Sequence, residues 1–180
     1  MLRDVRRLDR QLTRQAAWDS AWARRAVPAV EWAAEGTKLW WGLGAVMMAS
    51  GGRSGTKAAA AGLLSLLTAE LVSNALAKQV SERRRPPEQL VPHDDVEDRP
   101  DTSSFRSGHT AAAVGFTAAI AASSPGWGAA ASVPTAIVAV ERVHSGAHYP
   151  SDVVGGAAIG LASAWLIRRA PRPLLHKLLR

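Results

Sequence analysis

One segment of the chain carries two histidines beside groups that suit phosphoryl transfer. Residues 141–152 read Glu-Arg-Val-His-Ser-Gly-Ala-His-Tyr-Pro-Ser-Asp. His148 and Asp152 are spaced by one helical turn, so the carboxylate can accept a hydrogen bond from one ring nitrogen and leave the other free to attack. Arg142 offers a planar fork that matches a phosphate. We therefore predict a histidine nucleophile that an aspartate orients.

A second segment suits the binding of an anion. Residues 103–110 read Ser-Ser-Phe-Arg-Ser-Gly-His-Thr and open a stretch without charged residues. A helix that begins at Ser107-Gly108 presents free backbone N–H groups at its positive end, and glycine allows a close approach. His109 is then placed to give a proton to a leaving oxygen. The alternative is an ordinary serine cap followed by a solvent-facing histidine.

A third segment ends an apolar stretch with cations. Lys78 and Arg85 are seven residues apart, and Pro86 stops the helix after them. Two cations at this spacing can face the same way from a helix end and converge on an oxyanion. The alternative is a juxtamembrane cluster that only sets topology. Glu70 lies in register with Asn74 and Lys78, so we expect it to bond this stripe and orient Lys78.

The elements that position these residues are predicted to be helices in a membrane. Hydrophobic residues make up 47% of the 180 residues, aromatic residues only 6%, and cysteine is absent. Alanine and leucine favour helices, and a chain without cysteine has no disulfide framework and no thiolate metal site. Charged residues are concentrated between apolar segments rather than alternating with them, which is typical of spans. The apolar segments are residues 38–52, 58–77, 108–124, 127–140 and 153–168.

We therefore predict an all-α integral-membrane bundle of five to six core helices. Its catalytic part is residues 37–170, followed by a basic tail over residues 171–180. Gly156 and Gly160 form a small-xxx-small pair that allows close helix contact. Tight turns are expected at residues 51–55 and 123–126. Four tryptophans lie near predicted helix ends, where indoles favour the membrane interface: Trp40, Trp41, Trp127 and Trp165.

The N-terminal segment, residues 1–36, is predicted to contain an amphipathic helix. Apolar residues recur at helical spacing up to Ala26, and five arginines fill the opposite face between Arg3 and Arg14. A basic face of this kind is typical of a helix on a membrane surface, while a solvated helix packed on the bundle is the alternative. The net charge of +7 admits nucleic acid or an anionic membrane as partner. Apolar spans and the lack of a recognition motif argue against nucleic acid.

Together the three chemical segments resemble the type 2 phosphatidic acid phosphatase superfamily, whose signature is Lys-x6-Arg-Pro, then Pro-Ser-Gly-His, then Ser-Arg-x5-His-x3-Asp. The match runs from Lys78 to Asp152 with the blocks in order and every internal spacing kept. The resemblance implies a membrane lipid-phosphate phosphatase that works without a metal, and we expect no cofactor. It makes His148 the nucleophile, Asp152 its orienting group and His109 the acid. The implied phosphate ligands are Lys78, Arg85, Ser107, Gly108 and Arg142.

Two positions depart from the signature. Arg106 replaces the usual proline and Glu141 replaces the usual serine. Neither is an implied nucleophile, acid or phosphate ligand, so we expect activity to survive. Arg106 is an auxiliary candidate that would hold an extra substrate phosphate or pair with Glu141. The acidic stretch at residues 93–98 resembles a divalent-ion site, but we favour a solvated loop.

The substrate is expected to be a lipid phosphate. Within the family it would be phosphatidic acid, phosphatidylglycerophosphate or a polyprenyl phosphate; the composition looks like actinobacterial members, some of which are proposed to act on decaprenylphosphoryl-phosphoribose. The distribution of basic residues places the active site at the cytosolic face of a bacterial plasma membrane. A sixth crossing by residues 16–36 would reverse this orientation. The rival of another class is a non-catalytic membrane scaffold that keeps the fold.

Overall fold

The computed structural model describes residues 2–17, 29–30, 32–79, 85–91 and 107–170. These residues are almost entirely helical, and the described ranges contain no strand. The elements in chain order are α1 (Leu2–Ala16), η1 (Glu35–Thr37), α3 (Lys38–Ser50), α4 (Gly52–Gln79), η2 (Glu88–Leu90), α5 (Gly108–Ala121), α6 (Pro125–His144) and α7 (Pro150–Arg169).

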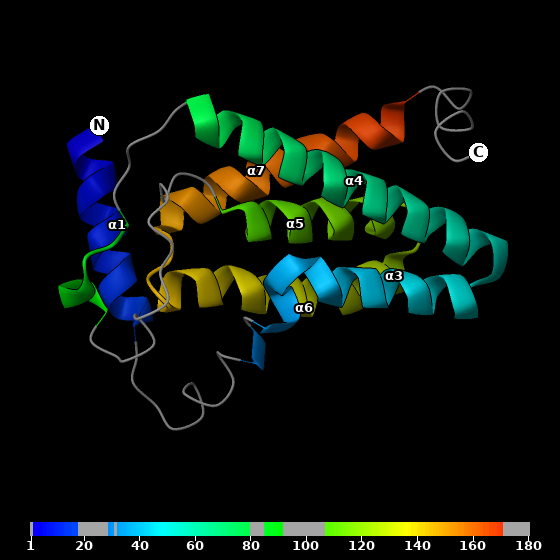
Figure 1. The fold of residues 1–180 in the computed structure, drawn as a ribbon, viewed down its shortest axis with the longest axis horizontal. Helices are drawn as coiled ribbons and strands as arrows, with labels where there is room; N and C mark the ends of the chain where they lie inside the picture. The colour runs from blue at the N-terminus through cyan, green and yellow to red at the C-terminus, as the bar shows by residue number, and fades with distance from the viewer. Residues whose placement is uncertain (1, 18–28, 31, 80–84, 92–106, 171–180) are drawn as a thin grey trace.

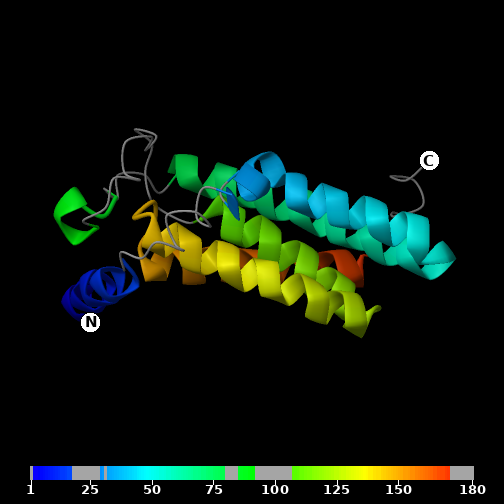
Figure 2. The ribbon, with the colours of Figure 1, turned by 90° about the horizontal axis from the view of Figure 1, so that it is seen from below.

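Five long helices form a bundle, and a sixth lies across one of its ends. Helices α3 to α7 run side by side, whereas α1 crosses the end of the bundle (Figures 1 and 2). Helix α5 packs against α4, α6 and α7 and therefore forms the centre. Because successive helices alternate in direction, α4 and α6 end where α5 and α7 begin, which is the end that α1 covers (Figure 1). The predicted all-α bundle is confirmed.

The central contact between α5 and α7 depends on two glycines. A Cβ atom added to Gly156 would lie 2.5 Å from the carbonyl oxygen of Ser107, and one added to Gly160 would lie 2.5 Å from that of Ala111. Real Cβ atoms essentially never approach other atoms that closely. The predicted small-xxx-small pair is thus confirmed, because only glycine lets the α5 backbone lie this close to α7.

The apolar core lies away from this contact, between α3, α4, α5 and α6. Trp40 is fully buried there, with its ring centroid 5.7 Å from that of Phe116. The prediction that Trp40 lies at the membrane interface is therefore wrong, since the indole fills the gap between α3 and α5. Trp41 and Trp165 are exposed, and Trp127 packs half-buried against the core.

Among the described residues, two helices are long and apolar enough to cross a bilayer, namely Gly52–Leu76 within α4 and all of α7. Helix α5 is apolar but shorter. Helix α6 extends beyond the apolar segment 127–140 at both ends, because it begins at Pro125 and continues to His144. The predicted turn at residues 51–55 is also shorter than expected. Gly51 alone separates α3 from α4, and Gly52 takes a left-handed conformation with φ of 55°.

Candidate active site

The Lys-x6-Arg-Pro segment reaches the segment that contains His148. Arg85 is half-buried, and its Nη1 atom donates a hydrogen bond of 2.7 Å to the carbonyl oxygen of Ala147. This bond joins residues that are 62 positions apart and places the guanidinium beside the backbone of the predicted nucleophile. The cation and His148 therefore lie at the same end of the bundle.

The Ser-Gly-His segment forms the start of α5 and lies at the same end of the bundle as His148. Ser107 is completely buried as the N-cap of α5, and its hydroxyl oxygen accepts hydrogen bonds from the backbone N–H and the hydroxyl of Thr110. The backbone N–H of Ser107 donates a bond of 3.2 Å to the carbonyl oxygen of Asp152. The start of α5 is thereby tied to the first turn of α7. Ser107 thus caps α5, as the alternative interpretation of this segment expected.

His148 lies in the turn between α6 and α7. Its backbone N–H donates a bond of 2.9 Å to the carbonyl oxygen of Arg142, and its side chain is buried. Helix α7 begins only at Pro150, so His148 and Asp152 do not share a helical turn as their spacing predicted. Asp152 is instead fixed at the start of α7, where its Oδ2 atom accepts a bond of 2.9 Å from the backbone N–H of Tyr149.

Arg142 lies in the last turn of α6 and pairs with its neighbour Glu141. The Nε atom of Arg142 donates to Oε2 of Glu141, and both side chains are buried. Glu141, which departs from the family signature, thus neutralises a cation expected to bind phosphate. Arg106 lies outside the described residues, so its predicted pairing with Glu141 stays a prediction.

Three further predicted residues are placed by the backbone. Lys78 lies in the last turn of α4, although its side chain is outside the described part of the structure. Gly108 is the first residue of α5, close to Ser73 of α4. Glu70 is half-buried on α4 and Asn74 is exposed. The role of Glu70 in orienting Lys78 stays a prediction.

His109, in the first turn of α5, has a carboxylate in its surroundings that the sequence did not indicate. Glu35 of η1 accepts a hydrogen bond of 2.8 Å from Lys38. This bond and the charge of Lys38 hold the pKa of Glu35 below its ordinary value, and the charge of His109 adds to the effect. Only the packing of η1 on α5 brings these groups together.

Helix α1 also contributes to this end of the bundle. Asp9 is buried, and its two carboxylate oxygens accept bonds of 3.0 Å and 2.8 Å from the backbone N–H and the hydroxyl of Ser151. A second link joins the Nδ1 atom of His144 to the carbonyl oxygen of Ala16 at 2.8 Å. Sequence reasoning missed Asp9, although an isolated carboxylate near the apolar stripe of an amphipathic helix is a usable signal.

No group of three or more histidine, aspartate or glutamate side chains could hold a metal ion in the described ranges. The acidic stretch at residues 93–98 lies outside those ranges. The predicted phosphate ligands are cations, a serine and a helix-end amide, and these roles stay predictions. Such a set suits an anionic substrate, because guanidinium groups and backbone N–H groups bind phosphoryl oxygens directly.

Comparison with known proteins identifies the family. The chain matches the PAP2 superfamily over residues 58–174. It belongs to this superfamily. None of the curated proteins matches it. Two solved structures share the fold. The first is the transmembrane PAP2 type phosphatidylglycerolphosphate phosphatase of Bacillus subtilis, with a TM-score of 0.68 and 22% identity over 94% of this chain and 89% of that one. The second is LpxE of Aquifex aeolicus, with a TM-score of 0.69 and 20% identity over 88% of this chain and 93% of that one.

Membership of the PAP2 superfamily confirms the resemblance drawn from the three segments, all of which lie within the matched residues. It also supports the predicted class of protein, a phosphatase, and the two long apolar helices agree with a place in the membrane. The roles of the individual side chains and the substrate are not decided by membership, because they depend on contacts with a bound ligand.

Proposed function

We propose that this PAP2 protein removes a phosphate from a lipid-linked substrate through a phosphohistidine intermediate. The observation that carries the proposal is the meeting of the three signature segments at one end of the bundle. Arg85 binds the carbonyl oxygen of Ala147, and Ser107 binds that of Asp152. Three segments between residues 78 and 152 thus meet near the turn that holds His148, as phosphoryl transfer by positioned groups requires.

In the first step a ring nitrogen of His148 attacks phosphorus in line with the leaving oxygen. The new N–P bond forms as the P–O bond to the lipid breaks, and His109 gives its proton to that oxygen. Asp152 stabilises the positive charge that develops on the attacking imidazole. Arg85, Arg142, Lys78, the hydroxyl of Ser107 and the backbone N–H of Gly108 neutralise the equatorial oxygens.

In the second step water attacks the phosphohistidine. His109, now neutral, takes a proton from the water as the new P–O bond forms and the N–P bond to His148 breaks. Inorganic phosphate leaves, and both histidines return to their starting protonation states. The sequence of steps requires neutral His148 and protonated His109 at the start, so the rate should show a bell-shaped dependence on pH.

The proposed substrate is a phosphomonoester or diphosphate of a membrane lipid, with decaprenylphosphoryl-phosphoribose or another polyprenyl phosphate as the specific candidate. Apolar side chains near the catalytic ends of three helices support a lipid substrate, since Leu71, Val140 and Val154 are exposed. Phosphatidic acid and phosphatidylglycerophosphate are the alternatives; the similar Bacillus protein is described as a phosphatidylglycerolphosphate phosphatase. The proposed location is a bacterial plasma membrane, with the active site at its cytosolic face.

The decisive experiment measures phosphate release from a panel of these lipids by the full chain in neutral detergent. Wild type should hydrolyse at least one of them, and His148→Ala should lose activity to background. Acid-quenched reactions with a ³²P-labelled substrate should leave label on wild type and none on His148→Ala. A wild type that releases phosphate from no member of the panel would support the scaffold alternative instead.

A further inference from the structure

Helix α1 is positioned as a surface helix at the catalytic end. It lies across the end of the bundle (Figures 1 and 2). Spans run along the membrane normal, so a helix that crosses their ends lies in the plane of the interface. The bonds from Asp9 to Ser151 and from His144 to the carbonyl oxygen of Ala16 hold it against α7 and α6.

The surface of α1 is divided into faces with different partners. Asp9 and Thr13 are buried against the bundle. Beside them runs an exposed apolar strip made of Val5, Leu8 and Leu12. The remaining face carries arginines and forms a groove with a volume of about 620 Å³. We call it the arginine groove; its lining residues are Arg3, Arg6, Arg7, Arg10, Gln11, Arg14 and Gln15.

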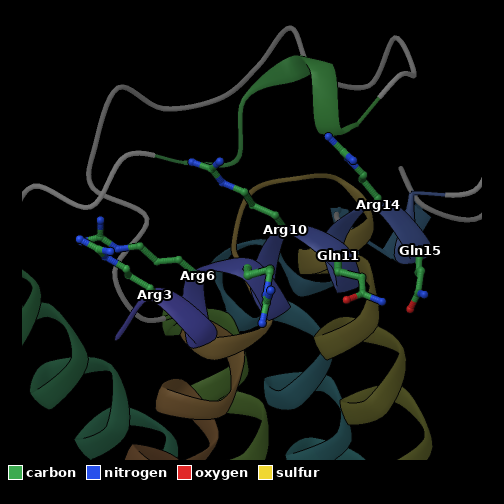
Figure 3. Close-up of a pocket in the computed structure, with 7 residues that line it drawn as sticks. Arg3, Arg6, Arg10, Gln11, Arg14 and Gln15 are labelled. Carbon is green, nitrogen blue, oxygen red and sulfur yellow. The ribbon is translucent and has the colours of Figure 1, made fainter. Parts of the chain in front are cut away.

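The charge of the arginine groove is largely uncompensated. Arg7 lies 3.8 Å from Asp4, with both side chains exposed. Within the described residues the other arginines of the groove, Arg3, Arg6, Arg10 and Arg14, have no carboxylate partner. Figure 3 shows Arg10 and Arg14 extending from α1 on the side of η2. Cations held this close repel one another unless an anion binds between them.

We infer that the arginine groove binds the phosphate of an anionic phospholipid of the surrounding bilayer. A guanidinium binds phosphate with two parallel hydrogen bonds, and five arginines line this groove along α1. The apolar strip of Val5, Leu8 and Leu12 lies on the same helix and suits the acyl region below the head group. This site is separate from the one at His148, because the groove lies on a different face of α1 from Asp9, which contacts Ser151.

The test measures lipid binding directly and does not use turnover. Fluorescent phosphatidylglycerol is titrated onto the full chain in dodecylmaltoside micelles, in the His148→Ala background. The groove variant carries Arg3→Gln, Arg6→Gln, Arg10→Gln and Arg14→Gln. The control variant also loses four positive charges, but at the opposite end of the bundle, where α4 begins and α7 ends. Its substitutions are Arg53→Gln, Lys57→Gln, Arg168→Gln and Arg169→Gln.

A basic residue near an anionic surface contributes roughly fivefold to binding. The groove variant should therefore lose about tenfold or more in affinity, and the control variant should stay close to the parent protein. Equal losses in the two variants would overturn the inference, since they would reflect net charge alone. Two measurements on the parent protein need no folded variant. Binding of phosphatidylcholine as tight as that of phosphatidylglycerol, or displacement of the lipid by millimolar inorganic phosphate, would also overturn it.

Phosphatidylglycerol has no phosphomonoester, so this result is independent of the proposed phosphatase activity. If lipid binding disappears in the groove variant and wild type hydrolyses no substrate of the panel, the arginine groove is established and the catalytic proposal is refuted. The reverse combination would refute only the groove.

Discussion

Replacement of Gly156 by alanine should damage the active site by separating two helices. The added Cβ atom would lie 2.5 Å from the carbonyl oxygen of Ser107 and 3.4 Å from the backbone nitrogen of Ala111. The first contact must open by at least 0.5 Å to reach the 3.0 Å limit seen for real Cβ atoms. Both neighbours are backbone atoms, so no side chain can rotate away. Helix α5 must therefore move away from α7.

This movement acts on the bond that joins two signature segments. A displacement of 0.5 Å would stretch the 3.2 Å bond from the N–H of Ser107 to the carbonyl oxygen of Asp152 beyond hydrogen-bonding distance. Misplacement of catalytic groups by about 1 Å can cost on the order of 100-fold in rate. We expect kcat of Gly156→Ala to fall by about 10- to 100-fold. Overpacking should cost about 1–3 kcal/mol of stability.

Two other glycines distinguish a local effect on the active site from a general loss of stability. A Cβ added to Gly160 meets the carbonyl oxygen of Ala111 at 2.5 Å, one turn further from the site. Gly160→Ala should therefore lower stability to a similar extent and kcat less. A Cβ added to Gly42 on α3 meets nothing within 4 Å, so Gly42→Ala should change neither.

The assay compares kcat, KM and thermal unfolding of the three variants in detergent. The reasoning fails if Gly156→Ala keeps wild-type kcat. It fails equally if Gly160→Ala reduces kcat as much as Gly156→Ala does, because the loss would then follow stability and not the distance from Ser107.

Other variants test single contacts at the catalytic end. Asp9→Ala removes both carboxylate oxygens that accept hydrogen bonds from Ser151, and it should lower kcat with little change in KM. Asp9→Asn keeps one acceptor oxygen and should retain more activity. Equal kcat values for the two variants would contradict this reasoning. Arg85→Lys keeps the charge but loses the planar fork, and should raise KM for the substrate several-fold; an unchanged KM would argue against phosphate binding by this side chain.

Much of the fold follows from local patterns in the sequence. The five long helices coincide with the five apolar segments, because a stretch without charged residues that is rich in alanine and leucine has few other stable conformations in a membrane. The close contact at Gly156 and Gly160 was also predictable, since small residues one turn apart mark a surface that another backbone can approach.

The candidate active site, too, was only partly predictable from the sequence. The spacing within each signature segment singled out His109, His148 and Asp152 as chemical groups, and their individual roles stay predictions. The same spacing was misleading about conformation, because it suggested a shared helical turn for His148 and Asp152, whereas α7 begins only at Pro150.

Contacts between distant parts of the chain were decided only by tertiary structure. Asp9 meets Ser151 across 142 positions, and the charge of His109 reaches Glu35 because η1 packs on α5. The burial of Trp40 against Phe116 is of the same kind. Sequence patterns report what a residue does with neighbours three or four positions away, since those distances are set by the helix itself. Which faces meet depends instead on how closely whole helices can pack, and that is a property of the assembled bundle.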